Sequence, residues 1–351
     1  MNYKECFITG EMPIIEAMSL LVKLGTRILL LVDAEEKLLG TLTDSDIRRW
    51  IIKTGSVEGT AGEVANRNPK YIHEDEDFTL KELFDHYQVD ALPVVDPDMV
   101  VTGIEFLYNP KLNQKGVLDL PVVMMAGGKG TRLYPYTQIL PKPLIPVNEI
   151  PIAERILNEF HSFQCSDFYM IVNYKKEMIK AYFSEVSLPY RVHFVDETTP
   201  LGTGGGLRLM KGMLTSTFVL TNCDSMILAD YSKMLDYHKK SGNAITFVCS
   251  LINYEVPYGI VEFEEGGKIT GLREKPSYSF FTNTGMYFVE PVVFDHIREN
   301  EKIDFPSIAE RCRENGLSVG VYPINSKAWL DMGQFDSMQE MEEQLREQEK
   351  I

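Results

Sequence analysis

A glycine-rich segment directly follows an apolar run, and this combination could bind phosphate. The apolar letters VVMM at 122–125 lead into AGGKGTRL at 126–133. Three glycines in four positions allow the backbone to approach a bulky polyanion closely. Arg132 inside the segment and Lys142, held between two prolines, add two cations that favour an anion. We therefore predict a phosphate-binding loop, although a glycine-rich turn of this kind can also be purely structural.

The spacing of these glycines excludes two other phosphate-binding motifs. The pattern G-x-x-x-x-G-K-[ST] of the P-loop is absent. The dinucleotide-binding fingerprint requires a third glycine where this chain has Leu133. If the segment binds phosphate, it therefore does so as another kind of phosphate site.

Two aspartates could hold a divalent cation beside this loop. Asp224 ends the apolar run FVLTNC, and Asp331 follows Trp329-Leu330. Mg²⁺ binds few protein carboxylates and keeps waters and phosphate oxygens as its other ligands, which suits a pair of aspartates. We predict that Asp224 and Asp331 share a Mg²⁺ that bridges phosphates; for either residue alone, an aspartate in a turn or helix cap is the alternative.

The elements that must position these residues alternate along the chain. Between 121 and 224, apolar strand-like runs alternate with amphipathic helical stretches, such as DFYMIVN followed by EMIKAYFSEV. This order predicts an α/β fold, a Rossmann-like, doubly wound, mostly parallel sheet with its ligands at the carboxyl ends of the strands. The α/β domain spans 121–335, a linker occupies 116–120, and a charged C-terminal helix at 336–351 is expected to pack or to face a partner.

Residues 1–115 contain an internal repeat. The strand-like runs RILLLVD and ALPVVD lie about 63 residues apart, and each comes directly after a short polar helix end. Each run is followed by a turn and a second strand, around Gly40 and Gly103. This pattern predicts a small α+β unit that is used twice.

The first copy of the repeat carries a candidate nucleotide site at Thr43 and Asp46. A junction between a strand and a helix offers backbone N–H groups to a phosphate and a carboxylate to ribose hydroxyls, although the same residues could simply cap a helix. Over residues 5–110 the repeats resemble the CBS-pair (Bateman) module, which binds adenine nucleotides in many proteins. The second copy lacks the Thr and the Asp, so at most one regulatory purine nucleotide is expected.

The stretch GGKGTRLYPYTQILPKPLIPV at 127–147 closely resembles the signature of sugar-1-phosphate nucleotidylyltransferases. Further stretches agree in the family's order, namely PLGTGG at 200–205, LTNCD at 220–224, PYG at 257–259, EKP at 274–276, NTG at 283–285 and WLDMG at 329–333. The resemblance covers about residues 120–335. It implies a nucleotidyltransferase domain that makes an NDP-sugar and pyrophosphate from an NTP and a sugar 1-phosphate, with Mg²⁺.

The chemistry of this reaction fits the residues. A sugar 1-phosphate already carries an anionic nucleophile, so the reaction needs alignment and charge neutralisation and no general base. The resemblance implies that Arg132, Lys142, Asp224 and Lys275 are catalytic. It places the nucleotide against Ala126, Gly127, Gly128, Gly130, Thr131, Glu197 and Gly202.

The sugar half of the site is assigned by the resemblance. Glu274 would accept hydrogen bonds from sugar hydroxyls, and Lys275 would bind the sugar phosphate. Tyr258, Gly259 and Asn283 would line the sugar pocket. Taken alone, the letters EKP are more typical of a solvated loop.

The glutamate at position 197 indicates which nucleotide base the site would bind. Relatives that use uridine or thymidine nucleotides usually carry Gln here, which offers one donor and one acceptor, whereas a carboxylate only accepts. Guanine presents N1–H and N2–H₂ side by side, so a carboxylate can accept both in a bidentate pair, and we predict GTP. The alternative is a Glu that only caps the following glycine-rich loop. The CBS fusion is similar to bacterial guanylyltransferases of the GDP-glucosamine or GDP-mannose type. A UTP- or dTTP-using enzyme and a catalytically silent nucleotide-sensing subunit stay open.

Composition narrows the class of protein. The chain has 35 Lys and Arg against 51 Asp and Glu, a net charge of −16, which is the wrong sign for binding nucleic acid or an anionic membrane. Its five cysteines are scattered and its start does not resemble a signal peptide, so we expect a cytoplasmic protein. The resemblances also imply a homo-oligomer.

Overall fold

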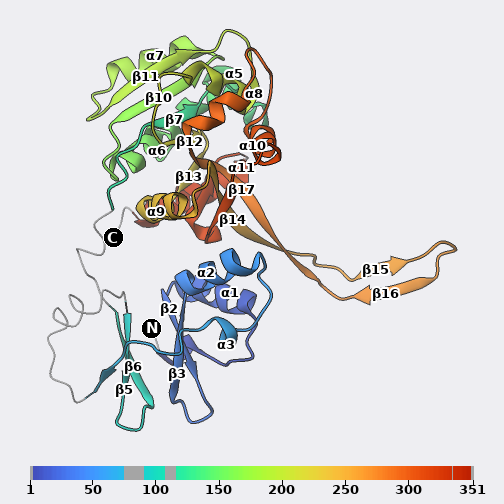
Figure 1. The fold of residues 1–351 in the computed structure, drawn as a ribbon. Helices are drawn as coiled ribbons and strands as arrows, with labels where there is room; N and C mark the ends of the chain where they lie inside the picture. Colours follow the sequence, from blue (N-terminus) through green and yellow to red (C-terminus); the bar gives the residue numbers. More distant parts are fainter. Residues whose placement is uncertain (1–2, 75–90, 107–115, 334, 349–351) are drawn as a thin grey trace. The chain divides into compact units, whose positions relative to one another are not determined.

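The computed structural model describes residues 3–74, 91–106, 116–333 and 335–348. The chain divides into two compact units, Met1–Gln114 and Lys115–Ile351, and each is described by itself (Figure 1).

The N-terminal unit contains two small sheets of the same topology. In the first, β1 (Phe7–Ile8) pairs parallel with β2 (Ile28–Val32), which pairs antiparallel with β3 (Leu38–Thr43). The second repeats this with β4 (Ile72–His73), β5 (Ala91–Val95) and β6 (Val101–Phe106). Both hairpins have a register shift at the equivalent place, between Leu31 and Val32 and between Val94 and Val95. The predicted internal repeat is therefore present in the sheets; the helix end predicted before the second copy lies outside the described residues.

Helices of the first copy cover its sheet. They are η1 (Tyr3–Cys6), α1 (Ile14–Leu24), α2 (Asp44–Thr54) and α3 (Ala61–Val64). Apolar residues at helical spacing, such as Ile14, Ala17 and Leu21, are buried against Leu29 and Leu31 of β2. Helix α1 ends at Gly25, whose left-handed backbone suits glycine.

The second unit is built on a seven-stranded sheet in the order β11-β10-β7-β12-β17-β14-β18. The pairings between β11, β10, β7 and β12 are parallel, as is that of β14 with β18, and β17 is antiparallel to both of its neighbours. The strands are β7 (Val122–Met125), β10 (Asp167–Val172), β11 (Arg191–Asp196), β12 (Phe218–Asn222), β14 (Ile245–Glu255), β17 (Ser277–Val289) and β18 (Val319–Ile324). The predicted mostly parallel α/β sheet is confirmed.

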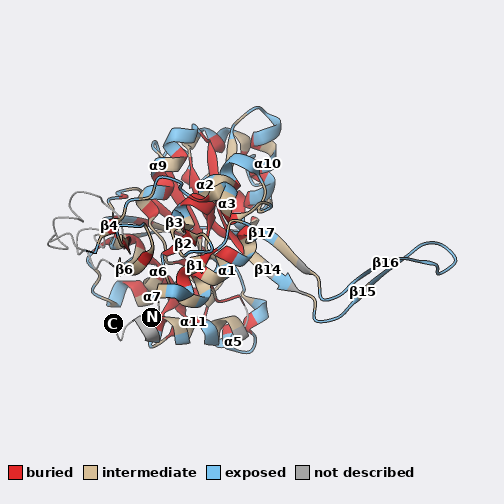
Figure 2. Ribbon diagram, turned by 90° about the horizontal axis from the view of Figure 1, so that it is seen from below, coloured by how far each residue is buried: buried red, intermediate tan, exposed pale blue. Residues whose placement is uncertain are grey.

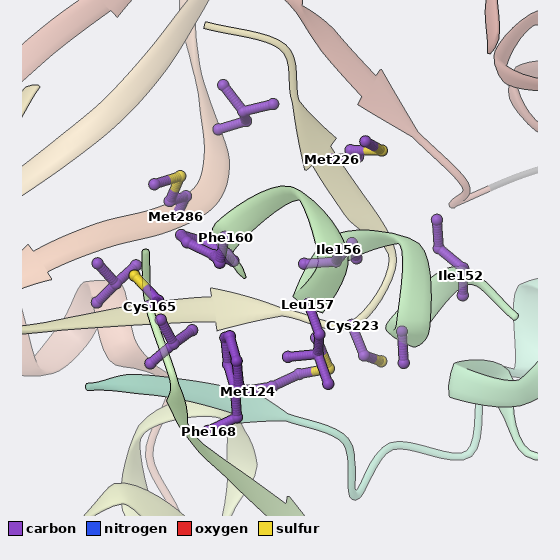
Figure 3. Close-up of a cluster of buried hydrophobic side chains, with 14 of the residues drawn as sticks. Met124, Ile152, Ile156, Leu157, Phe160, Cys165, Phe168, Cys223, Met226 and Met286 are labelled. Atoms are coloured by element: carbon purple, nitrogen blue, oxygen red, sulfur yellow. The ribbon is translucent and has the colours of Figure 1, made fainter. Parts of the chain in front are cut away.

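Apolar cores lie on both faces of this sheet. Alternate residues of β7 enter different cores. Val122 and Met124 belong to one, which we call the first core, and Val123 belongs to the other. Figure 3 shows Met124 in the first core together with Phe160 of α6 and Phe168 of β10. The covering helices are α6 (Ile152–His161), α7 (Lys176–Glu185), α9 (Tyr231–Ser241), α10 (Phe305–Glu314) and α11 (Phe335–Gln348).

The predicted C-terminal helix is present as α11 and packs against the sheet, because Met341 and Leu345 are buried in the first core. The glycine-rich segment that begins at Pro200 forms α8 (Gly202–Gly205), and a 3₁₀ helix η4 (Gly206–Met210) follows it. This segment is closely packed, because a Cβ on Gly205 would lie 2.1 Å from the carbonyl oxygen of Glu301.

Strands β14 and β17 extend beyond the sheet and lead into a two-stranded ribbon, β15 (Ile260–Phe263) and β16 (Ile269–Arg273). The ribbon projects away from the sheet and helices of its unit (Figure 1). The remaining short elements are η2 (Thr131–Leu133), α5 (Tyr136–Ile139), η3 (Lys142–Leu144), β8 (Pro146–Val147), β9 (Ile150–Pro151), β13 (Ser225–Ile227), η5 (Pro291–His296), η6 (Ser326–Ala328) and β19 (Trp329–Asp331). Among the described residues, no helix has the length and apolar character needed to cross a membrane.

Candidate active site

A pocket opens at the carboxyl ends of β7 and β12. From β7 the chain winds outward to β10 and β11, and then returns to place β12 on the other side of β7. Such a reversal of strand order separates the loops of the two strands and leaves a crevice between them. The pocket has a volume of about 420 Å³, within the usual size of a small-molecule site. Its walls are Met125, Gly127, Gly128, Gly130, Thr131, Arg132, Lys142, Glu197, Pro200, Gly202, Thr203, Asn222, Cys223, Asp224 and Asp304.

The glycine-rich loop after β7 forms one wall of this pocket. Gly130 has φ 63°, and a Cβ there would lie 2.9 Å from the side chain of Thr137. Its carbonyl oxygen accepts a hydrogen bond from the Thr137 hydroxyl at 2.9 Å. Ala126 is buried and donates its N–H to the carbonyl oxygen of Ile171, so it holds the loop without lining the pocket. The loop is therefore anchored at both ends and open to a ligand between them.

Opposite charges meet on the floor of the pocket. Lys142, which begins the short helix η3, forms an ion pair with the Oδ2 atom of Asp224. The Arg132 side chain lies in η2 on the same pocket. The structure thus brings together three of the predicted catalytic residues, which lie in separate parts of the sequence.

Asp331 lies beside Asp224. In the antiparallel pair β13–β19, Asp331 is opposite Ser225, and the backbone N–H of Met332 donates to the carbonyl oxygen of Asp224 at 2.8 Å. Burial raises the pKa of Asp331, the negative charge of Asp224 raises it further, and Lys142 and Arg132 partly oppose this rise. A Cβ on Gly333 would lie 2.6 Å from Oδ2 of Asp331, so glycine gives this carboxylate room.

This pair fits the donor set of Mg²⁺. Two carboxylates on adjacent backbone segments leave the other coordination positions to phosphate oxygens and water, as this ion prefers. Within the ranges that the structure describes, no cluster of three or more His, Cys, Asp or Glu side chains could hold a metal. The metal-binding role of Asp224 and Asp331 stays a prediction.

The two carboxylate oxygens of Glu197 lie beside different glycine-rich segments. Oε1 accepts a hydrogen bond from the backbone N–H of Leu201 at 2.9 Å, which caps the following glycine-rich turn. A Cβ on Gly127 would lie 3.0 Å from Oε2, so this second oxygen adjoins the phosphate loop. Glu197 is buried, and this burial raises its pKa. The capping interaction that the sequence analysis left open is present, and it leaves Oε2 on the side of the pocket.

The second glycine-rich turn is held by residues that the sequence analysis did not select. A Cβ on Gly202 would lie 2.7 Å from the carbonyl oxygen of Ile303. Thr203 accepts a hydrogen bond from the N–H of Phe305 at 3.2 Å and lies 3.5 Å from Oδ1 of Asp304. The sequence offers one signal for Asp304, namely its place directly before helix α10. Its contact with a turn about a hundred residues away is decided by the fold.

The predicted sugar-binding residues lie outside the pocket lining. Tyr258 and Gly259 connect β14 to β15, and Glu274 and Lys275 connect β16 to β17; all four are exposed. A Cβ on Gly259 would lie 2.7 Å from Oε2 of Glu274, so these two connections touch each other. Their part in sugar binding stays a prediction.

Asn283 is the predicted sugar residue that lies within the seven-stranded sheet. It lies in β17 and donates a hydrogen bond from Nδ2 to the Tyr287 hydroxyl at 2.7 Å. A Cβ on Gly285 would lie 2.3 Å from Nδ2 of Asn222, which lines the pocket. The NTG segment therefore adjoins the pocket on the side of β12.

In the N-terminal unit, Thr43 and Asp46 form a capping box at the start of α2. Oδ2 of Asp46 accepts hydrogen bonds from the Thr43 N–H at 2.9 Å and from its hydroxyl, and Oδ1 is paired with Arg49. Oδ2 already accepts two hydrogen bonds, whereas Oδ1 has one partner and can accept one further hydrogen bond. The regulatory nucleotide at this junction stays a prediction.

Comparison with protein families gives two matches. A family described as "Nucleotidyl transferase" matches residues 121–348, and one described as "CBS domain" matches residues 1–53.

Curated relatives match about three fifths of the chain. The chain is 28% identical over 239 residues to a UTP–glucose-1-phosphate uridylyltransferase of Synechocystis, covering 61% of this chain and 60% of the relative. It is 29% identical to the bifunctional protein GlmU of Methanococcus maripaludis, covering 61% of this chain and 51% of the relative. It is also 29% identical to a mannose-1-phosphate guanylyltransferase catalytic subunit beta of Drosophila pseudoobscura, covering 60% and 58%. The chain thus spans 51% to 60% of the length of these relatives.

Among solved structures, the crystal structure of HddC from Yersinia pseudotuberculosis complexed with GMP-PN matches with a TM-score of 0.50 at 20% identity. The match covers 64% of this chain and 99% of that one. At this identity the likeness concerns the fold.

Proposed function

The chain belongs to the nucleotidyl transferase family, and on that premise we propose that it is a sugar-1-phosphate nucleotidyltransferase that uses GTP. In this reaction an oxygen of the sugar 1-phosphate forms a bond to the α-phosphorus of GTP. The bond from that phosphorus to the β-phosphate oxygen breaks, and pyrophosphate leaves. The products are a GDP-sugar, from a hexose or hexosamine, and pyrophosphate.

One observation carries this proposal. The glycine-rich loop, two cations and a carboxylate come together in a single pocket at the reversal point of the sheet. A phosphoryl-transfer site needs a backbone cradle for phosphates and fixed charges around the reacting phosphorus, and little covalent chemistry from the protein. The pocket supplies these parts.

Each charged group has a role in this proposal. Arg132 and Lys142 neutralise phosphate oxygens, and the Lys142–Asp224 ion pair keeps both side chains in place before a substrate binds. Mg²⁺, held by Asp224 and Asp331, would supply positive charge for the phosphates and for the departing pyrophosphate. Lys142 would then exchange its contact with Asp224 for a contact with a phosphate.

The choice of GTP rests on Glu197. The names of the curated relatives include both a uridylyltransferase and guanylyltransferases, so they leave the base open. Oε1 of Glu197 is occupied by the Leu201 N–H, and Oε2 adjoins the pocket. Oε1 can join the predicted bidentate pair with guanine only by sharing its hydrogen bond from Leu201. Oε2 can accept from guanine N1–H or N2–H₂, which lie side by side, whereas the single N3–H of uracil lies between two carbonyl oxygens that a carboxylate repels.

The test is a grid of pyrophosphate-release assays over five NTPs and a panel of hexose and hexosamine 1-phosphates. We expect turnover with GTP, and the sugar 1-phosphate that releases pyrophosphate identifies the second substrate. The panel includes glucosamine 1-phosphate, which would give the GDP-glucosamine used for surface sugars. Absence of pyrophosphate in every cell of the grid, with nucleotide binding retained, would favour the alternative of a catalytically silent sensing subunit.

A Glu197→Gln variant tests the base within the same grid. The glutamine Oε1 can still accept the Leu201 N–H, so we expect the fold to persist and the preference for GTP over UTP to fall by at least ~10-fold. Asp196→Asn is the matched control, because Asp196 pairs with Lys176 and Lys180 and does not line the pocket. An unchanged GTP preference in Glu197→Gln, or a wild-type preference for a pyrimidine nucleotide, would contradict this assignment.

A purine nucleotide at Thr43 and Asp46 is a separate proposal, supported by the CBS match over residues 1–53. Titration calorimetry of the full chain with AMP is expected to detect binding that Thr43→Val removes. Absence of binding to the wild type would leave the capping box as the only role of these residues.

A further inference from the structure

Asp304 lines the pocket from the N-terminus of α10. It occupies the N-cap position, where an aspartate commonly accepts hydrogen bonds from the first backbone N–H groups of its helix. Among the described residues, its side chain makes no capping hydrogen bond. Instead, Oδ1 accepts from the backbone N–H and the hydroxyl of Thr203, at 3.4 and 3.5 Å. Both distances are long for a hydrogen bond, so the carboxylate is held weakly, on the side of the pocket.

The backbone before Asp304 is fixed against the second glycine-rich turn. The carbonyl oxygen of Ile303 accepts hydrogen bonds from the N–H groups of Gly204 and Gly205, both at 3.0 Å. The Ile303 N–H donates to the carbonyl oxygen of Leu201 at 2.9 Å. Helix α10 buries one side and leaves the other exposed (Figure 2). The packing of this segment therefore gives Asp304 a fixed place on the pocket wall.

The chemistry of a carboxylate limits what Asp304 can contact. An ionised carboxylate only accepts hydrogen bonds, so it needs a donor from the ligand. It would repel phosphate oxygens, which are expected beside Arg132 and Lys142. In the part of the chain that the structure describes, Oδ2 of Asp304 has no hydrogen-bond or ion-pair partner. A donor group outside the triphosphate is therefore the partner that suits this oxygen.

The turn beside Asp304 is also the turn that Glu197 caps. The Leu201 N–H donates to Oε1 of Glu197, and a Cβ on Gly202 would lie 2.9 Å from Oδ1 of Asp304. The two carboxylates thus flank one short stretch of backbone on the pocket wall. Guanine presents two donor groups side by side, N1–H and N2–H₂, whereas Glu197 has one oxygen without the Leu201 hydrogen bond. A second acceptor is needed for the second donor group.

We propose that Asp304 is this acceptor, and that it receives a hydrogen bond from the N2 amino group of guanine while Oε2 of Glu197 accepts from N1–H. The assignment rests on the proposed use of GTP and adds a second specificity-determining residue to it. Adenine carries no amino group at C2, and uracil offers a single donor, so neither base satisfies both carboxylates. An acceptor that loses its donor on binding lowers affinity, so Asp304 would favour GTP over nucleotides without the N2 amino group.

Inosine triphosphate (ITP) tests this contact, because its base keeps the N1–H of guanine and lacks the N2 amino group. For the wild type we expect kcat/KM with GTP to exceed that with ITP by at least ~10-fold. Asp304→Ala is expected to lower the GTP value much more than the ITP value and to bring the two within about two-fold of each other. Asp304→Asn keeps a carbonyl oxygen that can accept from the amino group, so part of the preference is expected to return.

Two controls accompany this comparison. Asp295→Ala removes a carboxylate that pairs with Lys211 and does not line the pocket, and it is expected to keep the GTP-to-ITP ratio of the wild type. Glu197→Gln changes the acceptor for N1–H, which both nucleotides carry, so we expect parallel losses with GTP and ITP. Thermal unfolding of the full chain establishes that each variant is folded.

The outcomes separate this contact from a structural role and from the proposed function. Equal losses with GTP and ITP in Asp304→Ala would mean that Asp304 only supports the turn or contacts a part common to both nucleotides, and would overturn the assignment. A wild type that uses GTP but does not distinguish it from ITP would do the same and leave the use of GTP standing. A wild type that prefers UTP to GTP would overturn the use of GTP and this assignment with it.

Discussion

The nucleotide side and the sugar side of the predicted active site are held in very different ways. On the nucleotide side, Gly130, Lys142, Glu197 and Asp224 come from different parts of the chain and line one pocket. On the sugar side, Tyr258, Gly259, Glu274 and Lys275 lie in two exposed connections beside a projecting ribbon.

The difference shows how each kind of scaffold places its residues. Parallel strands end at one edge of a sheet, so the loops that follow them are gathered by the same pairing that builds the core. A two-stranded ribbon has no such edge, and its position relative to the pocket depends on what packs against it. We therefore expect substitutions on the nucleotide side to affect the reaction itself and those beside the ribbon to affect the binding of one substrate.

The largest expected effect follows from Asp224→Asn. This change removes one metal carboxylate and the charge partner of Lys142, so we expect kcat to fall roughly 10³-fold or more with little change in the melting temperature. Pyrophosphate release and thermal unfolding measure the two quantities. Asp236→Asn makes the same chemical change on the exposed face of α9 and is expected to act like the wild type. Activity of the Asp224→Asn protein within a few-fold of normal would remove Asp224 from the site.

Arg132→Ala is expected to lower kcat/KM by at least ~10²-fold, a loss of ~2.7 kcal/mol, because the variant lacks the guanidinium that would stabilise negative charge in the transition state. Lys129→Ala is the matched control, since Lys129 is a neighbouring exposed cation of the same loop that does not line the pocket. Equal losses in both variants would indicate a general effect of charge, and a change in melting temperature alone would indicate loop packing.

The smallest effect is expected from Lys275→Ala. One exposed cation beside the ribbon should raise KM for the sugar 1-phosphate by roughly three- to tenfold and leave KM for the nucleotide unchanged, because exposed ion pairs contribute little each. Steady-state kinetics with each substrate varied in turn measures the difference, and Lys268→Ala on the loop between β15 and β16 controls for charge. A change in KM for the nucleotide would contradict the separation of the site into a nucleotide side and a sugar side.

The glycine-rich loop that lines the pocket could be predicted from sequence because its signals are local. Three glycines after an apolar strand, with Arg132 next to them, specify a tight loop that leaves room for a polyanion, and the alternation of strands and helices specifies the sheet that carries it. Asp304 could not be selected in this way. Its contact with Thr203 joins residues about a hundred positions apart through packing between α10 and the second glycine-rich turn.

The sequence by itself determined the α/β class, the repeat in the N-terminal unit and the residue types available for phosphate chemistry, because periodicity, turn residues and charge are properties of short segments. Only the tertiary structure decided that Lys142 pairs with Asp224, that one oxygen of Glu197 caps a turn while the other adjoins the pocket, and that EKP lies beside a projecting ribbon. Such contacts depend on which distant segments pack together, and that is settled by the burial of the whole apolar core rather than by any one stretch of the chain.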